Sequence, residues 1–251
     1  MKLLISIILS GLFYSVALST PTKLIVRAKA KDAKFIGSSI GGAKIIIRDV
    51  VSGEVLSQGL TEGSTGNTQL IIREPHKRYT PITDEATAKF ETTIDLEEPL
   101  LIEVEAIAPF NQKQASVSAS TQLWLIPGKD IVGEGLILEI PGFVVNILSP
   151  QTHESISIEN QNLTIRANVV MMCGCTISEG GLWDSNKIEV EATIGRSGKI
   201  IETIPMEITE KVNTFEADLE FSEAGLYQIT VSAYQKETGN TGVDKVNFIV
   251  R

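Results

Sequence analysis

The chain has 251 residues, of which 43% are hydrophobic, 21% charged and 6% aromatic. These values are typical of a globular protein and exclude disorder, collagen-like repeats and a small disulfide-dense fold. With 22 basic and 31 acidic residues the formal net charge is −9, which argues against a protein that grips phosphate backbones through its overall charge, so nucleic acid is not an expected partner.

Residues 1–19 are interpreted as a signal peptide. The segment opens with a positive charge and continues for 16 residues without one, and Ala17 to Ser19 match the small residues that precede a cleavage site. This apolar run is shorter than the about 20 residues that a membrane-spanning helix needs. We therefore expect a mature chain that begins near Thr20, has no transmembrane segment and is periplasmic or secreted.

Short segments rich in β-branched residues predict strands through the first half of the mature chain. The expected strands are 23–28, 43–50, 68–73, 89–96, 100–108, 116–126 and 135–140. Glycine pairs and Gly-Ser sequences between several of these segments are turn signals. The polar stretch 74–86, which contains two prolines, is the longest expected loop. No amphipathic helix is expected.

A domain boundary is expected at Pro141-Gly142, because these residues end one strand and a new alternating series begins at Phe143. The charge also changes there. Residues 20–141 carry 13 basic and 16 acidic side chains, whereas residues 142–251 carry 8 and 15, a net charge of 8 − 15 = −7. We therefore predict two domains, 20–141 and 142–251.

The second half shows cleaner alternation of apolar and polar residues. Apolar residues occupy every second position in three segments, Leu163 to Val169, Ile188 to Ile194 and Phe215 to Phe221. A one-sided apolar row indicates a sheet with one buried face, and several such strands at similar spacing predict a sandwich. The predicted fold class is therefore all-β, with two consecutive antiparallel β-sandwich domains after a cleaved signal peptide.

The first half carries a family resemblance in three short segments. These are Gly41-Gly42-Ala43 to Asp49, Ser52 to Leu56 and Gly59 to Glu62. Together they resemble the carboxypeptidase-regulatory-like and transthyretin-like sandwiches of secreted bacterial proteins, in which a strand, a turn and a returning strand follow one another in this way. The resemblance implies a β-sandwich for residues 20–141.

The end of the chain resembles the last hairpin of immunoglobulin-like and fibronectin-type-III-like domains. The segments that carry this resemblance are Ala224 to Ala233, Gly239 to Gly242 and Val246 to Val250. Tyr227 stands where such folds keep a tyrosine corner. Members of these families are mostly spacers, adhesive modules and assembly parts, so the resemblance implies a role of that kind without a specified ligand.

The segment Met171-Met172-Cys173-Gly174-Cys175, called here the sulfur pentapeptide, holds four sulfur side chains and both cysteines of the chain. If the preceding strand stays extended, Met171, Cys173 and Cys175 continue its inward row and Met172 points outward. Thiolates and thioethers suit Cu(I), so these four residues are candidate Cu(I) ligands. Zinc fits less well, because a closed structural zinc site has four ligands.

Two other interpretations of the sulfur pentapeptide stay open. One is a disulfide, which needs Cβ atoms about 3.8 Å apart, whereas extended residues two apart are separated by about 6.6 Å. Pairing would require a tight turn at Gly174, and the bond would add about 1.6 kcal/mol or less, which makes it a candidate redox switch. The other is a purely structural role, in which Met171 fills space in the core.

Trp183 lies in the loop that follows the sulfur pentapeptide. It is one of only two tryptophans in the chain. A tryptophan in this position is either a lid on the end of the sandwich or a contact residue for a protein partner, and it could also shield the sulfur atoms. We name Trp183 as a candidate partner contact.

The predicted function is that of a non-enzymatic, exported interaction or assembly module that binds a protein through exposed loops or a sheet edge. The sequence contains no Gly-x-Ser-x-Gly elbow, phosphate loop or dinucleotide fingerprint. No motif places either of its two histidines beside a nucleophile. The alternative is a Cu(I)-binding or thiol-redox protein that uses the sulfur pentapeptide, and no cofactor other than Cu(I) is expected.

Overall fold

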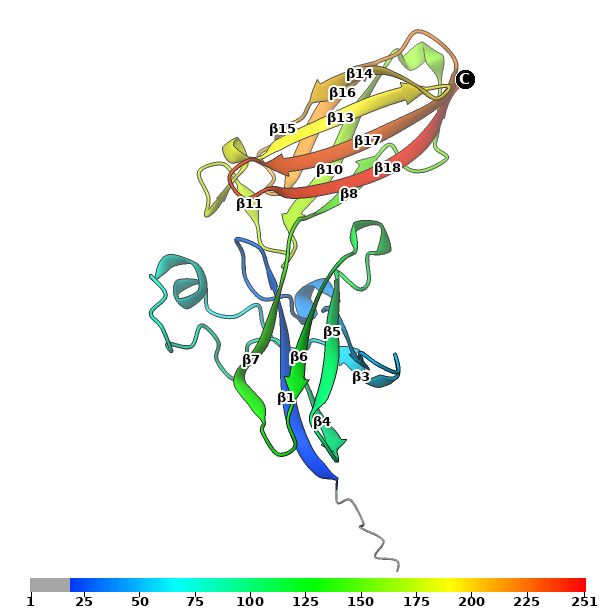
Figure 1. Cartoon of the computed structure of the whole chain (residues 1–251). Helices are drawn as coiled ribbons and strands as arrows, with labels where there is room; N and C mark the ends of the chain where they lie inside the picture. Colours follow the sequence, from blue (N-terminus) through cyan, green and yellow to red (C-terminus); the bar gives the residue numbers. More distant parts are fainter. Residues whose placement is uncertain (1–18) are drawn as a thin grey trace, which may run out of the picture.

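The computed structural model describes residues 19–251 (Figure 1). The expected signal peptide, apart from Ser19, lies outside the described residues. Strands make up 57% of the structure and helices 8%, so the predicted all-β class is confirmed. In the described part of the chain, no helix has the length and apolar character needed to cross a membrane.

The N-terminal half, residues 20–140, forms two sheets. Its strands are β1 (Thr20–Ala30), β2 (Lys44–Asp49), β3 (Val55–Leu60), β4 (Phe90–Leu96), β5 (Leu100–Ala108), β6 (Val117–Leu125) and β7 (Ile131–Ile140). One sheet has the order β4-β1-β7 and the other the order β3-β2-β5-β6. All pairs are antiparallel except β1 with β7, which is parallel.

Three short helical turns connect these strands, η1 (Ser38–Ile40), η2 (Gln69–Arg73) and η3 (Lys113–Ala115). The expected strand 68–73 is therefore wrong. The side chain of Asn67 accepts a hydrogen bond from the Gln69 amide at 2.8 Å, and the Ile71 amide donates to the Asn67 carbonyl at 3.0 Å. These local hydrogen bonds override the β propensity of the segment. The segment forms a π-helical turn, and the side chain of Ile71 within this turn is buried.

The C-terminal half, residues 143–250, also forms two main sheets. Its strands are β8 (Phe143–Ser149), β9 (Ser155–Ile156), β10 (Asn162–Met171), β11 (Ile177–Ser178), β12 (Trp183–Asp184), β13 (Glu189–Arg196), β14 (Lys199–Pro205), β15 (Glu207–Ile208), β16 (Thr214–Glu220), β17 (Gly225–Gln235) and β18 (Asn240–Val250). The orders are β15-β16-β10-β8 and β14-β13-β17-β18-β9, while β11 and β12 pair separately. The 3-10 turns are η4 (Ile158–Asn160) and η5 (Ser185–Lys187).

The expected alternation decides which faces of this half are buried. In β10 the residues Ile165, Ala167 and Val169 are fully buried, and their polar neighbours point away from the core. The hydroxyl of Tyr227 donates to the Glu223 carbonyl at 2.8 Å, and its ring stacks on Phe248 with centroids 5.3 Å apart. This is the tyrosine-corner arrangement that the sequence resemblance implies.

No strand is shared between the two halves (Figure 1). β7 leads through Pro141-Gly142 directly into β8. Buried apolar residues of both halves nevertheless form one continuous cluster, and η3 of the N-terminal half packs against β8 and β18. The contact region between the halves, called here the junction, is therefore part of the core.

Candidate functional site

The sulfur pentapeptide lies at the junction. β10 ends at Met171 and the chain turns, with the Gly174 amide donating to the Met171 carbonyl at 2.7 Å and the Met171 amide to the Cys175 carbonyl at 3.2 Å. Gly174 has a φ of 75°, and a methyl group on it would lie 3.2 Å from Ile40 of the N-terminal half. Glycine provides both the left-handed backbone and the close approach.

This turn closes a disulfide between Cys173 and Cys175, whose Cα atoms are 5.3 Å apart. The strand therefore does not stay extended through residue 175, and Met172, which was expected to point outward, is buried with 1% of its surface exposed. All four sulfur side chains are buried, and Cys175 is the most exposed of them at 7%. The tight turn that the disulfide interpretation required is present at Gly174.

The arrangement of the sulfur atoms limits what the segment can bind. Within residues 19–251 there is no cluster of three or more His, Cys, Asp or Glu side chains that would hold a metal ion. While the disulfide is intact, neither cysteine offers a thiolate. Cu(I) binding by Cys173, Cys175, Met171 and Met172 stays a prediction, and it concerns the reduced protein.

Trp183 joins the two halves from β12. Its indole Nε1 donates to the carbonyl of Asp32 at 2.8 Å, and 8% of the residue is exposed. The interpretation of Trp183 as a lid over the end of the sandwich agrees with this burial. In the described structure its hydrogen bond is made within its own chain, so a contact with another protein stays a prediction.

Asn240 makes a second polar link across the junction. It is fully buried at the start of β18. Its Nδ2 donates to the Lys31 carbonyl at 3.1 Å, and its Oδ1 accepts from the Gly142 amide at 2.8 Å. One buried amide therefore fixes the linker and the first half at once, and its polar atoms are satisfied at the junction.

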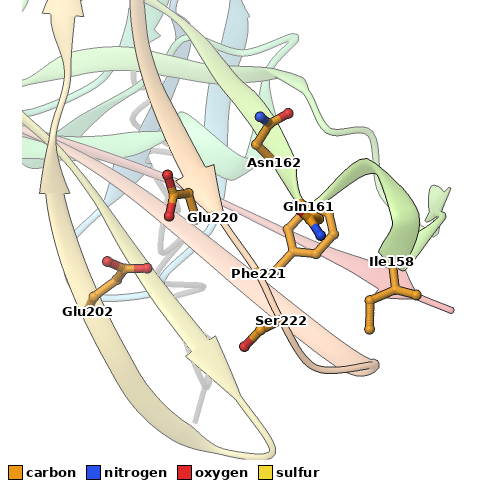
Figure 2. Close-up of a pocket in the computed structure, with 7 residues that line it drawn as sticks. All are labelled: Ile158, Gln161, Asn162, Glu202, Glu220, Phe221 and Ser222. Carbon is orange, nitrogen blue, oxygen red and sulfur yellow. The ribbon is translucent and has the colours of Figure 1, made fainter.

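The C-terminal half contains a cavity of about 680 Å³ (Figure 2). It is lined by Ile158, Gln161, Asn162, Glu202, Glu220, Phe221 and Ser222. Glu202 comes from β14 and Glu220 from β16, which lie beside each other in opposite sheets. Both carboxylates are exposed, and neither has an ion pair or a side-chain hydrogen bond with another described residue.

The strands on either side of this cavity have open edges. β14 pairs with β13 on one side, and no strand of residues 19–251 pairs with it on the other. β16 is covered by β15 only at Phe215 and Glu216, so 217–220 are unpaired on that side. We call the cavity with these two edges the β14–β16 slot. Open strand edges present unpaired backbone donors and acceptors, so the slot can accept another strand.

β14 also exposes apolar side chains. Only Ile204 among its seven residues is even partly buried, while Ile200 is 74% and Ile201 51% exposed. On the outer face of the sheet, Leu226 is 57% exposed near Ile200, where both line a small hollow beside Gly195. Edge strands are usually protected by charge or by cover, so this combination marks β14 as a candidate binding edge.

The residues of the slot are not adjacent in the sequence and were not predicted to meet. Glu202 and Glu220 are 18 residues apart and become neighbours only because β14 and β16 end up at the same side of the sandwich. One signal was present: 199–205, which reads KIIETIP, has two adjacent isoleucines in place of strict alternation. Loss of alternation is what an edge strand exposed on both faces would show.

Comparison with known proteins identifies no family for this chain. No family model and no curated protein matches the sequence. Among solved structures, the fibronectin(III)-like modules of Clostridium thermocellum CbhA are 12% identical over 92% of this chain and 94% of that one, with a TM-score of 0.30. The titin domains z1z2 in complex with telethonin are 10% identical over 93% and 96%, with a TM-score of 0.26.

Two further matches differ in coverage. The fimbrial anchor protein Mfa2 from Porphyromonas gingivalis is 10% identical over 88% of this chain and 80% of that chain, with a TM-score of 0.27. An engineered protein is 16% identical over 51% of this chain, which spans only 24% of its length, with a TM-score of 0.34. With identities of at most 16% and TM-scores of at most 0.34, these matches carry no conclusion about this chain.

Proposed function

We propose that this protein is an exported, non-enzymatic interaction module that binds a protein partner through an open sheet edge. The observation that carries the proposal is β14, an edge strand with two exposed isoleucines and, among the described residues, no strand on its outer side. A backbone edge gives affinity through main-chain hydrogen bonds, and neighbouring apolar side chains add buried area when a partner covers them.

The test is site-specific cross-linking in the cells that produce the protein. A photoreactive amino acid replaces Ile201 on β14, and in a matched control it replaces Thr93, an exposed residue on β4 of the other half. We expect one discrete adduct from position 201 and none from position 93, identified by mass spectrometry. No adduct from position 201, or equal adducts from both positions, would contradict the proposal.

Export is tested separately by sequencing the N-terminus of the protein recovered outside the cytoplasm. Cleavage after Ser19 would leave Thr20, the first residue of β1, at the N-terminus. A chain recovered from the cytoplasm with Met1 still present would contradict export without bearing on the binding edge.

A second proposal concerns the sulfur pentapeptide. The specific observation that favours it is the gathering of four sulfur side chains in one turn next to a junction that holds the halves together. Two electrons and two protons from a dithiol reductant would convert the disulfide into two thiols, which could then bind Cu(I) as thiolates.

Titration with Cu(I) against a competing chelator tests this second proposal. The reduced protein is expected to bind one Cu(I), and the oxidised protein none. Cys173→Ser and Cys175→Ser should each abolish binding, whereas Ser222→Ala, far from the cysteines in the fold, should not change it. Lack of competition by the reduced protein would eliminate Cu(I) binding.

A further inference from the structure

We infer that the β14–β16 slot binds an extended, basic peptide segment of a partner protein, which adds as a strand to the open edge and places Lys or Arg side chains beside Glu202 and Glu220. This inference rests on the proposed function and specifies the chemistry of the partner.

The shape of the slot suits an extended chain. The slot is open along β14 and along residues 217–220 of β16. A strand spans about 3.3 Å per residue and needs a neighbouring edge with free N–H and C=O groups. The slot provides such groups on its two sides, so an extended chain satisfies them better than a compact ligand would.

The polar side chains that line the cavity have no hydrogen-bond partners among the described residues. No side-chain hydrogen bond within the described structure involves Gln161, Asn162, Glu202, Glu220 or Ser222. By contrast, nearby charged side chains on the same sandwich are paired, as in Arg166 with Glu216 and Arg196 with Glu223. The donors and acceptors of the slot are therefore free to receive a ligand.

The negative charge of the C-terminal half favours a basic ligand. The C-terminal half has a net charge of 8 − 15 = −7, and two of its unpaired carboxylates face the slot from adjacent strands (Figure 2). Extended segments place alternate side chains on one face, so a segment with basic residues at every second position would bring several of them to this side. Acidic segments would be repelled by the same carboxylates.

Two apolar side chains close one end of the cavity. Phe221 is 6% exposed, and its ring lies 6.4 Å from that of Tyr227, centroid to centroid, inside the tyrosine corner. Ile158 lines the cavity from η4. These residues give the cavity a rigid apolar end, against which the aliphatic part of a Lys or Arg side chain packs while its charged end reaches Glu202 or Glu220.

The experiment uses the mature protein, residues 20–251, and a labelled ten-residue peptide that alternates lysine with valine. Binding is measured by fluorescence anisotropy at low salt. A second peptide of equal charge replaces every valine with proline, which cannot donate to a strand edge. We expect the lysine–valine peptide to bind and the lysine–proline peptide to bind at least tenfold more weakly.

The variant test combines Glu202→Gln with Glu220→Gln, and its matched control combines Glu97→Gln with Glu98→Gln. Both pairs remove two exposed charges, the control pair from the turn between β4 and β5. We expect the slot pair to weaken binding about tenfold and the control pair to leave it unchanged. Bound peptide should also slow amide exchange in 199–204 and 217–220.

Failure has a defined form. Equal binding of both peptides, equal losses in both variant pairs, or no binding at all would overturn the inference. A cross-linked partner at position 201 together with any of these results would leave the interaction function standing and reject only the basic extended segment. Peptide binding without a cross-linked partner would support the slot chemistry and count against the proposed function.

Discussion

The junction between the two halves and the β14–β16 slot of the C-terminal half differ in burial and in how their polar groups are paired. At the junction, Trp183 and Asn240 are buried and their polar atoms are hydrogen-bonded to backbone groups of the other half or the linker. In the slot, Glu202 and Glu220 are exposed and have no ion pair or side-chain hydrogen bond with another residue of 19–251. The comparison indicates that the junction holds the chain together and that the slot is available to another molecule.

The comparison also changes the meaning of the two features that stand out in the sequence. The sulfur pentapeptide and Trp183 attract attention because their residue types are rare, yet both are packed into the core. The slot is made of common residues whose positions matter. The rare residue types therefore lie in the buried junction, and common residues at an open edge form the candidate binding region.

The largest expected effect is that of Trp183→Ala, which should lower the free energy of unfolding by about 3–5 kcal/mol, because it removes a large buried side chain and leaves the Asp32 carbonyl unpaired. Urea unfolding at pH 7 measures the change. The matched control is Trp124→Ala on β6, where the indole is 61% exposed, with an expected change of about 0.5 kcal/mol. Similar losses in both variants would break the contrast between buried and open surface.

Asn240→Ala should cost about 2 kcal/mol, because the Gly142 amide and the Lys31 carbonyl lose their partner inside the core. The control is Asn247→Ala, whose exposed side chain accepts a hydrogen bond from Gln228 at 3.2 Å and should matter by less than about 0.5 kcal/mol. Binding of the lysine–valine peptide should be the same in both variants. A loss of peptide binding in Asn240→Ala would show that junction and slot are coupled.

Reduction of the Cys173–Cys175 disulfide should lower the free energy of unfolding by about 1.6 kcal/mol or less, since the bond closes a loop of only three residues. Unfolding curves with and without a dithiol reductant measure the change, and a Cys173→Ala/Cys175→Ala variant that no longer responds to the reductant is the control. If reduction lowered the free energy of unfolding as much as Trp183→Ala does, the covalent disulfide itself, and not the packing of the buried side chains, would be the main stabiliser of the junction.

The smallest expected effect is a pH dependence beside the junction. Backbone hydrogen bonds, first from Asn186 at 3.1 Å and then from Gly180 at 3.0 Å, lower the pKa of the Asp184 carboxyl. Because this pKa is lower in the folded state, the stabilisation is fully present above the unfolded value of about 4 and is lost as the pH falls through the folded value.

Thermal unfolding between pH 6 and pH 2 tests this sign. The Asp184→Asn variant should melt lower than the unchanged protein at pH 6, and the difference should shrink as the pH falls. An Asp95→Asn variant, in which an exposed carboxylate of β4 is replaced, serves as the control for the loss of one surface charge. A difference that grows toward acid pH would contradict the assigned cause.

Much of the fold could be predicted because strands leave a local signature. β5 matches the expected segment 100–108, and the apolar row of β10 is buried as its period-two pattern indicates. The prediction was wrong at 68–73, where the Asn67 cap and local hydrogen bonds produce a π-helical turn in a segment of strand-like composition. Short-range hydrogen bonding is not visible in a hydrophobic pattern.

The candidate sites were less predictable. The disulfide was one of three interpretations that the sequence left open, and burial of Met172 was not expected, because the reversal at Gly174 depends on the close approach of Ile40 from the other half. The β14–β16 slot was missed altogether. Its residues lie in segments that the sequence does not connect, and their proximity depends on strand order.

The sequence by itself determined that this protein is all-β and which faces of its strands are buried, since side-chain period and turn residues are local properties of the chain. Only the tertiary structure decided that the sulfur pentapeptide is buried at the junction and that Glu202 and Glu220 line the same cavity. The physical reason is that pairing between distant strands fixes which side chains meet. The residue pattern of a single strand does not specify which strand lies beside it.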